Sequence, residues 1–152
     1  MVKIRKAELK DSNLVFNLTK NVFKTYQSLF PTTPALLEGK EDVKRDIVEK
    51  EVLIAEIEGK AIGTVRYYAK NDNFYLIRLG ILAEYRGAKV GSRLIAEVED
   101  RARDDGAKKI ILYSPYSLKG IIDFYKKLGY KIKKIREDDD YARAKFVKLI
   151  DS

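Results

Sequence analysis

The chain contains no cysteine and no histidine among its 152 residues. Without cysteine it has no disulfide framework, no thiol nucleophile and no zinc–cysteine site. Without histidine it lacks the side chain that most often acts as a general base or binds a metal. These absences exclude a hydrolase of the usual Ser-His-Asp type, and we expect no metal site.

Long apolar runs are also missing. No stretch approaches the roughly 20 apolar residues that a helix needs to span a bilayer. The first residues, Met1–Lys6, lack the apolar segment of a signal peptide. We therefore expect no membrane partner and, as the default, a cytoplasmic location.

What the sequence does contain is the composition of a globular protein. Apolar residues make up 45% of the chain, and 152 residues suit a single domain, which we place at 1–152. The formal charge of +8 would suit a nucleic acid, an acidic partner or an anionic cofactor. The basic residues are scattered among acidic ones instead of forming a stripe with aromatic residues, which argues against a nucleic acid.

The apolar periodicity predicts an α/β (α+β) fold with a mixed, mostly antiparallel twisted sheet. In the first half, one strand and two helices precede three strands, which tight turns at Gly59 and Asn71–Asn73 connect. In the second half, a helix, a strand, a helix and two strands follow. This gives about seven strands, with about four helices on the two faces of the sheet. The segment 26–39 contains Pro31 and Pro34 and is expected to be a loop.

The stretch from Leu79 to Tyr130 organises the chain. Leu79–Leu82 is a short apolar run typical of a buried strand, and Arg86–Ser92 is a turn that contains two glycines. A turn that leads directly into a helix leaves unpaired backbone N–H groups and the positive end of the helix dipole at one point, which favours a phosphate. Helical spacing of apolar residues begins in this turn, at Val90, Leu94, Ile95, Val98 and Ala102.

Two motifs in this stretch resemble signatures of the GNAT family of N-acetyltransferases. The family's pyrophosphate loop has the pattern Arg/Gln-x-x-Gly-x-Gly/Ala; Arg86 and Gly91 match its first and last positions, and Lys89 replaces the middle glycine. The segment Phe124–Tyr130 resembles the family's Phe/Leu-Tyr-x-Lys-x-Gly-Phe/Tyr helix end. The two motifs occur in the family's order.

The resemblance implies a GNAT-like fold with acetyl-CoA as the co-substrate. In the family the turn binds the pyrophosphate, while the preceding strand bends away from its neighbour and pairs with the pantetheine amides. Gly80, inside that strand, indicates a bulge or a close backbone approach. If the turn needs a positive φ at Lys89, that residue costs about 1 kcal/mol. The residues expected to bind the cofactor are Ile81, Leu82, Ala83, Arg86, Gly87, Ala88, Lys89, Val90, Gly91 and Ser92.

Tyr125 is the expected catalytic residue. Its position on an amphipathic helix would also suit a core tyrosine. The resemblance favours a general acid, because a phenol with a pKa of about 10 can protonate the thiolate that leaves when an amine attacks a thioester. No general base is identified, since Ile77 and Arg78 stand where the family often has a carboxylate. Arg78 would instead attract an acidic acceptor.

The leading hypothesis is an acetyl-CoA-dependent N-acetyltransferase that acts on a primary amine of a small molecule, a peptide N-terminus or a lysine. Direct transfer in a ternary complex is expected, because no cysteine or histidine is present to carry the acetyl group. The alternative is a non-catalytic acyl-CoA-binding sensor module, which the missing base allows. The expected partners are acetyl-CoA and an amine acceptor of unknown identity, and a homodimer is left open.

Overall fold

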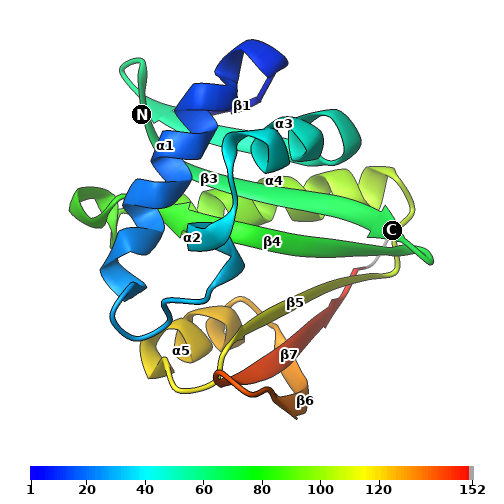
Figure 1. Cartoon of the computed structure of the whole chain (residues 1–152). Helices are drawn as coiled ribbons and strands as arrows, with labels where there is room; N and C mark the ends of the chain where they lie inside the picture. Colours follow the sequence, from blue (N-terminus) through cyan, green and yellow to red (C-terminus); the bar gives the residue numbers. More distant parts are fainter. Residues whose placement is uncertain (151–152) are drawn as a thin grey trace. The chain divides into compact units, whose positions relative to one another are not determined.

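The computed structural model describes residues 1–150, and in that range the chain forms seven strands and five α-helices (Figure 1). The strands are β1 (Val2–Lys6), β2 (Glu51–Ile57), β3 (Lys60–Lys70), β4 (Asn73–Ile81), β5 (Lys109–Pro115), β6 (Lys131–Glu137) and β7 (Ala142–Leu149). The helices are α1 (Ser12–Phe23), α2 (Pro34–Leu37), α3 (Lys40–Glu49), α4 (Val90–Asp104) and α5 (Lys119–Lys127).

The strands form one mixed sheet in the order β1-β2-β3-β4-β5-β7-β6. The pairs β1–β2, β2–β3, β5–β7 and β6–β7 are antiparallel, and β4–β5 is parallel. The parallel ladder joins Asn73–Tyr75 to Lys109–Ile111, although both strands continue beyond it. The predicted fold class, a mostly antiparallel mixed sheet with helices, is confirmed.

The chain divides into two compact units. The first contains Met1–Tyr68 and Arg78–Glu97, and the second contains Ala69–Ile77 and Val98–Ser152. Strand β4 and helix α4 therefore each contribute residues to both units. The prediction of a single domain over 1–152 stays a prediction.

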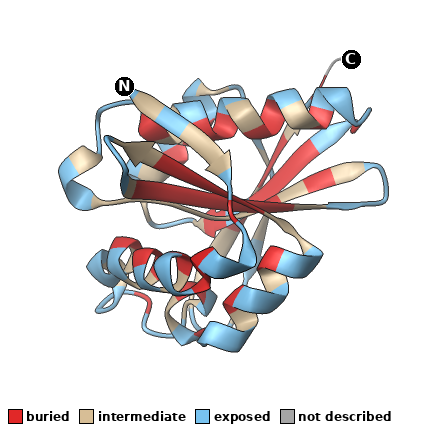
Figure 2. Cartoon of the chain, turned by 90° about the horizontal axis from the view of Figure 1, so that it is seen from above, coloured by how far each residue is buried: buried red, intermediate tan, exposed pale blue. Residues whose placement is uncertain are grey.

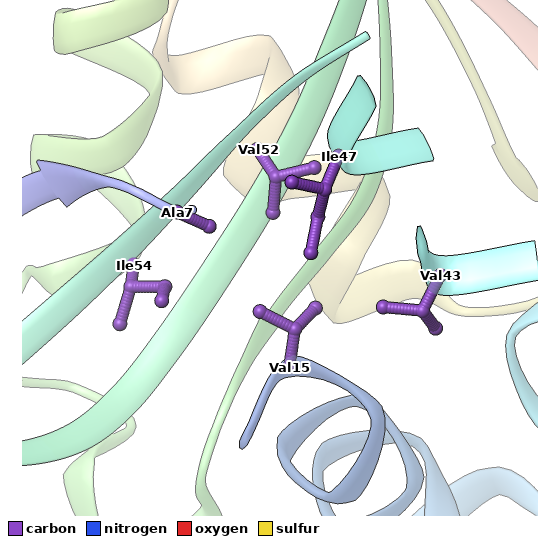
Figure 3. Close-up of a cluster of buried hydrophobic side chains, with 6 residues drawn as sticks. All are labelled: Ala7, Val15, Val43, Ile47, Val52 and Ile54. Carbon is purple, nitrogen blue, oxygen red and sulfur yellow. The ribbon is translucent and has the colours of Figure 1, made fainter. Parts of the chain in front are cut away.

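The core of the first unit lies between helices and strand β2. In Figure 3, Val15 of α1 and Val43 and Ile47 of α3 point toward β2. Val15 and Val43 are completely buried, as expected for helices with one apolar face. Figure 2 shows buried positions concentrated on one side of the helices, with exposed positions on the other. The β2 residues and the neighbouring residue that complete the cluster are Val52, Ile54 and Ala7.

Two hairpins have the turn chemistry that the sequence predicts. Glu58 and Gly59, between β2 and β3, have φ values of 50° and 80°. Asn71 and Asp72, between β3 and β4, have φ values of 52° and 65°. Two successive positive φ values are typical of the type I′ turn, whose twist matches that of paired strands.

The segment 26–39 differs from its prediction as a loop, because it contains the short helix α2. Pro34 is its first residue, a position that suits proline because the first N–H of a helix has no intrahelical partner. This turn of helix raises the number of α-helices to five among the described residues, where about four were expected from periodicity. Four residues are too few for the apolar period to show.

Candidate functional site

The end of β4 passes very close to α1 at Gly80. A Cβ atom at this position would lie 2.5 Å from Val22 Cγ2 and 3.2 Å from Phe23 Cε2, so a side chain does not fit without a shift. The predicted close approach of the backbone at Gly80 is confirmed. The unusual backbone of this strand is instead at Arg78, whose φ is 56°.

The residues that follow β4 are tied to the first unit by their own backbone. The N–H of Leu82 donates to the carbonyl of Ile62 on β3 at 2.8 Å. Ala83–Tyr85 then forms a single 3-10 turn, η3. Of the predicted contacts at the strand end, the Leu82 N–H is therefore already engaged within the protein.

The turn before α4 has the backbone that the glycine pattern suggests. Gly87 and Lys89 have φ values of 88° and 65°, so the turn does place a positive φ at Lys89, the case in which that residue carries a cost in free energy. Helix α4 begins at Val90, and the first N–H of this region with a helical partner is that of Arg93, which donates to the Lys89 carbonyl at 3.1 Å. Within residues 1–150 no acceptor is found for four successive N–H groups, those of Lys89, Val90, Gly91 and Ser92.

Arg86 holds this turn in place. Its Nε donates to the Ile81 carbonyl at 3.1 Å, and its Nη2 donates to the Val22 carbonyl at 3.0 Å. The guanidinium carbon lies 5.8 Å from the centre of the Tyr26 ring. Arg86 therefore links the turn to β4 and α1. Its charge joins those of Lys89 and Arg93, all on exposed residues, near the positive end of the helix dipole.

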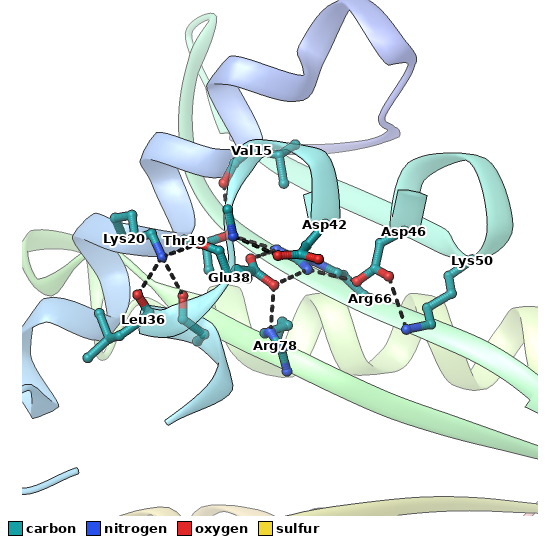
Figure 4. A network of polar contacts seen from close by, with 12 residues as sticks. Val15, Thr19, Lys20, Leu36, Glu38, Asp42, Asp46, Lys50, Arg66 and Arg78 are labelled. Carbon is teal, nitrogen blue, oxygen red and sulfur yellow. Dashed lines mark hydrogen bonds and ion pairs between the residues drawn. The ribbon is translucent and has the colours of Figure 1, made fainter. Parts of the chain in front are cut away.

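A buried ion-pair network occupies the same unit (Figure 4). Arg66 of β3 is completely buried, and its guanidinium donates to both carboxylate oxygens of Glu38, at 2.9 and 2.6 Å. It also donates to Asp46 at 2.9 Å and to Thr19 at 3.1 Å. Burial alone would lower the pKa of Arg66, but the hydrogen bonds and charges of the two carboxylates raise it above its ordinary value. Arg66 therefore stays charged in the core.

Lys20 fixes the chain segment that carries Glu38. Its ammonium donates to three backbone carbonyls, those of Ala35 at 3.3 Å, Leu36 at 2.6 Å and Glu38 at 2.6 Å. Burial lowers the pKa of Lys20, and the Glu38 carboxylate opposes that shift. These three bonds clamp the end of α2 onto α1 and set the position of Glu38.

Arg78 is the member of the network that comes from β4. Its Nε donates to Glu38 Oε1 at 3.2 Å, and a fifth of its side-chain surface is exposed. Arg78 was expected to attract an acidic acceptor, but its connection to Glu38 and Arg66 was not predicted. The available signal was Arg66, a charged residue in the middle of a strand between Val65 and Tyr67, since a charged residue that is buried needs a partner.

Tyr125 lies on α5 in the second unit, inside an aromatic cluster. It is 7% exposed, and its ring centre lies 5.3 Å from that of Phe146 and 6.0 Å from that of Tyr130. Gly129, with a φ of 95°, ends the helix and lets the Tyr130 N–H donate to the Tyr125 carbonyl at 3.1 Å. Packing and helix end together fix the position of the Tyr125 ring.

The neighbour of Tyr125 in this cluster is itself anchored. The Tyr130 hydroxyl donates to Glu99 at 2.9 Å, and Lys148 donates to the same carboxylate at 3.0 Å. Burial and the Glu99 carboxylate raise the pKa of the Tyr130 phenol. Tyr130 is therefore neutral and structural.

The structure brings the ten predicted cofactor-binding residues together on one continuous segment of the first unit, Ile81–Ser92, and it places Tyr125 in the second unit. In the described part of the chain, no three acidic side chains gather in a group that could hold a metal ion. No helix among residues 1–150 combines the length and apolar character required to cross a membrane. The cytoplasmic location and the homodimer stay predictions.

The sequence profile of the acetyltransferase (GNAT) family matches residues 20–130. The chain belongs to the GNAT family. This match confirms the family that the two motifs indicate. The matched range includes both motifs, the turn before α4 and the end of α5.

Similar proteins agree with the GNAT assignment. A probable N-acetyltransferase, camello, from Xenopus tropicalis is 30% identical over 81 residues, which are 51% of this chain and 37% of that protein. The chain therefore spans well under half of that relative. A PaiA N-acetyltransferase from Thermoplasma acidophilum in complex with coenzyme A has a TM-score of 0.84 at 20% identity, over 98% of this chain and 99% of that one. An aminoglycoside 6'-N-acetyltransferase complexed with coenzyme A has a TM-score of 0.78 at 17% identity, over 99% and 98%. At these identities the two structures show the fold.

Proposed function

We propose that this GNAT protein is an acetyl-CoA-dependent N-acetyltransferase that transfers an acetyl group to a primary amine. The observation that carries the proposal is the set of four unpaired N–H groups at Lys89–Ser92. Together with the helix dipole and the charges of Arg86 and Lys89, they match the oxygens of a diphosphate. The coenzyme A complexes of two proteins with the same fold support acetyl-CoA as the donor.

The proposal assigns a part to each segment of the predicted cofactor site. The N–H groups of Lys89–Ser92 bind the diphosphate, and Arg86 keeps the turn in the required shape. Gly87 and Gly91 leave room for the phosphate oxygens, with Ala88 between them. The pantetheine arm lies along Ile81, Leu82 and Ala83. The N–H of Leu82 does not bind it, because that group donates to the Ile62 carbonyl.

In the proposed transfer the amine nitrogen bonds to the acetyl carbon while the carbon–sulfur bond breaks. The Tyr125 hydroxyl gives its proton to the departing sulfur, and the surplus proton of the amine passes to water. Tyr125 suits this part because a neutral phenol is a proton donor at neutral pH. Direct attack fits a chain without cysteine or histidine, the side chains that most readily carry an acyl group.

The test combines binding and turnover. Thiol release from acetyl-CoA is measured with a panel of small amines, peptides with free N-termini and lysine peptides, and coenzyme A binding is measured by calorimetry. Gly91→Glu places a bulky anion among the four N–H groups, so we expect it to abolish coenzyme A binding and turnover. The matched control Ala96→Glu adds the same charge to an exposed position of α4 and should retain both.

Two results would contradict the proposal. Micromolar coenzyme A binding by Gly91→Glu would show that the turn is not the diphosphate site. Tight binding of acetyl-CoA by the wild type without transfer to any amine would favour the acyl-CoA sensor module instead.

A further inference from the structure

We propose that Arg78 binds a carboxylate of the acceptor, so that the substrate is an amine that also carries a carboxylate group. This inference rests on the proposed function and adds a substrate class to it. It follows from three properties of Arg78: its backbone, its unused donors and the charge around it.

The first property is the positive φ of Arg78 inside strand β4. A φ of 56° inside a strand is rare for a residue with a long side chain, and such conformations persist where the surrounding structure enforces them, often at binding sites. Glycine would adopt this φ without strain, yet arginine occupies the position. The side chain is therefore the feature that needs an explanation.

Two nitrogen atoms of the Arg78 guanidinium, Nη1 and Nη2, have N–H groups that are not used within the described part of the protein. Its Nε is bonded to Glu38 at 3.2 Å, which orients the group. Within residues 1–150 no acceptor is found for Nη1 or Nη2, and neither atom is among the buried unpaired ones. Both therefore reach solvent. Two parallel N–H donors at the end of an arginine match the two oxygens of a carboxylate.

The charge around Arg78 favours an anion. Glu38, its partner, is already held by two bonds from Arg66, and Lys20 donates to the Glu38 carbonyl. Arg66 and Arg78 therefore both bind this one carboxylate, and the Lys20 ammonium lies beside it. The other two acids of the network already have basic partners, which are Arg66 and Lys50 for Asp46 and Arg45 for Asp42. The local excess of positive charge would be neutralised by an incoming carboxylate.

The distance along β4 limits the size of the acceptor. Arg78 lies three residues before Ile81, the first residue assigned to the pantetheine arm, so the strand separates them by roughly 10 Å. The long Arg78 side chain can cover part of this interval, so an amino acid or the first residues of a peptide need bridge only the remainder, with the amine toward Ile81 and the carboxylate at Arg78. Two sources share this chemistry: the α-carboxylate of a free amino acid and the side-chain carboxylate of an acidic peptide.

The experiment compares matched amines that differ only in the carboxylate. Alanine is paired with alaninamide, and an amidated alanyl-glutamate with an amidated alanyl-glutamine. Wild type is expected to prefer the carboxylate member of at least one pair by about 10-fold or more in kcat/KM, as charge-assisted bidentate bonds allow. Arg78→Gly, which keeps the positive φ, should reduce the preference to within about twofold. The pair that shows the effect identifies the source of the carboxylate.

Controls separate this inference from the proposed function. Lys44→Gln removes one exposed positive charge of the same unit and should keep the wild-type preference. Arg78→Asn, which also tolerates a positive φ, replaces the glycine variant if that variant does not fold. Turnover of amides without any carboxylate preference in the wild type, or a preference that survives in Arg78→Gly, would overturn the inference and leave the transferase standing.

If no amine is turned over, the binding of the same amines tests whether Arg78 recognises a carboxylate. Calorimetry with the same four compounds and coenzyme A-saturated protein should then show carboxylate-dependent binding that Arg78→Gly loses. That result would support the carboxylate site while the transferase fails. Equal or absent binding by the wild type and the variant would overturn the inference.

Discussion

The hydroxyl of Tyr125 performs the proton-donating step of the proposed reaction, and its removal is a sharp test at the scale of one residue. Tyr125→Phe keeps the ring that packs against Phe146, so the fold and the coenzyme A affinity should be retained. Loss of a general acid typically lowers the rate by about 10²- to 10⁴-fold, and kcat with the best amine should fall within that range. Tyr113→Phe, at an exposed tyrosine of the same unit, is the matched control. Unchanged turnover in Tyr125→Phe would leave the residue a core tyrosine.

Single residues also show how far sequence reasoning reaches. The unusual backbone of Lys89 was predictable, because a motif places glycine at that position and the local geometry is set by neighbours in the chain. The positive φ of Arg78 was not, because no local motif marks that position and its side-chain partner, Glu38, is 40 residues away along the chain. Conformations that tertiary contacts impose leave no local pattern in one sequence.

At the scale of elements, the contact between β4 and α1 should be intolerant of any added atom. Gly80→Ala would place Cβ within 2.5 Å of Val22, so we expect the free energy of unfolding to fall by about 1 to 3 kcal/mol, as in other overpacked cores. Chemical denaturation measures this change. Gly120→Ala in α5 is the control: its Cβ would meet nothing within 4 Å, and alanine should be neutral or stabilising there. An equal effect of the two changes would contradict the close packing of β4 on α1.

Elements with a clear period or turn signature were predictable, and the others were not. The hairpins at Gly59 and at Asn71–Asp72 are indicated in the sequence by residue types that readily adopt a positive φ. Helix α2 was missed because four residues cannot display a 3.6-residue period. The network of Glu38, Arg66 and Asp46 joins β3, α3 and the segment after α2, and no spacing in the sequence relates them.

At the scale of the whole molecule, the absence of histidine shapes the response to pH. Apart from the α-amino group, no side chain has an ordinary pKa between about 5 and 8, so the free energy of unfolding should be nearly constant over that range. Below it, carboxylates that the folded state keeps ionised become protonated. Hydrogen bonds from Arg5, opposed by burial, lower the pKa of Asp11 below its ordinary value of 3.8. Its contribution is therefore fully present above that pH and is lost as the pH falls through the lower folded value.

Denaturation curves measured from pH 8 to pH 2 test this dependence. Asp11→Asn should lower stability at pH 7 and flatten the acid limb, because the bonds from Arg5 and from the Glu8 N–H lose their charged acceptor. Asp123→Asn, at an exposed position of α5, should leave the curve unchanged. A stability that varies strongly between pH 5.5 and 7.5 would contradict the expectation.

The two hydrogen bonds of Arg86, to the carbonyls of Ile81 and Val22, affect how the turn would bind a nucleotide. Since carbonyls of the protein itself already hold this guanidinium, the turn acquires its shape when the chain folds and not when a ligand arrives. A turn that is preorganised in this way loses little conformational entropy when a ligand binds. The free energy of binding is therefore set mainly by the contacts between the turn and the ligand. Loosening either attachment would weaken the complex without removing any group that touches the phosphates.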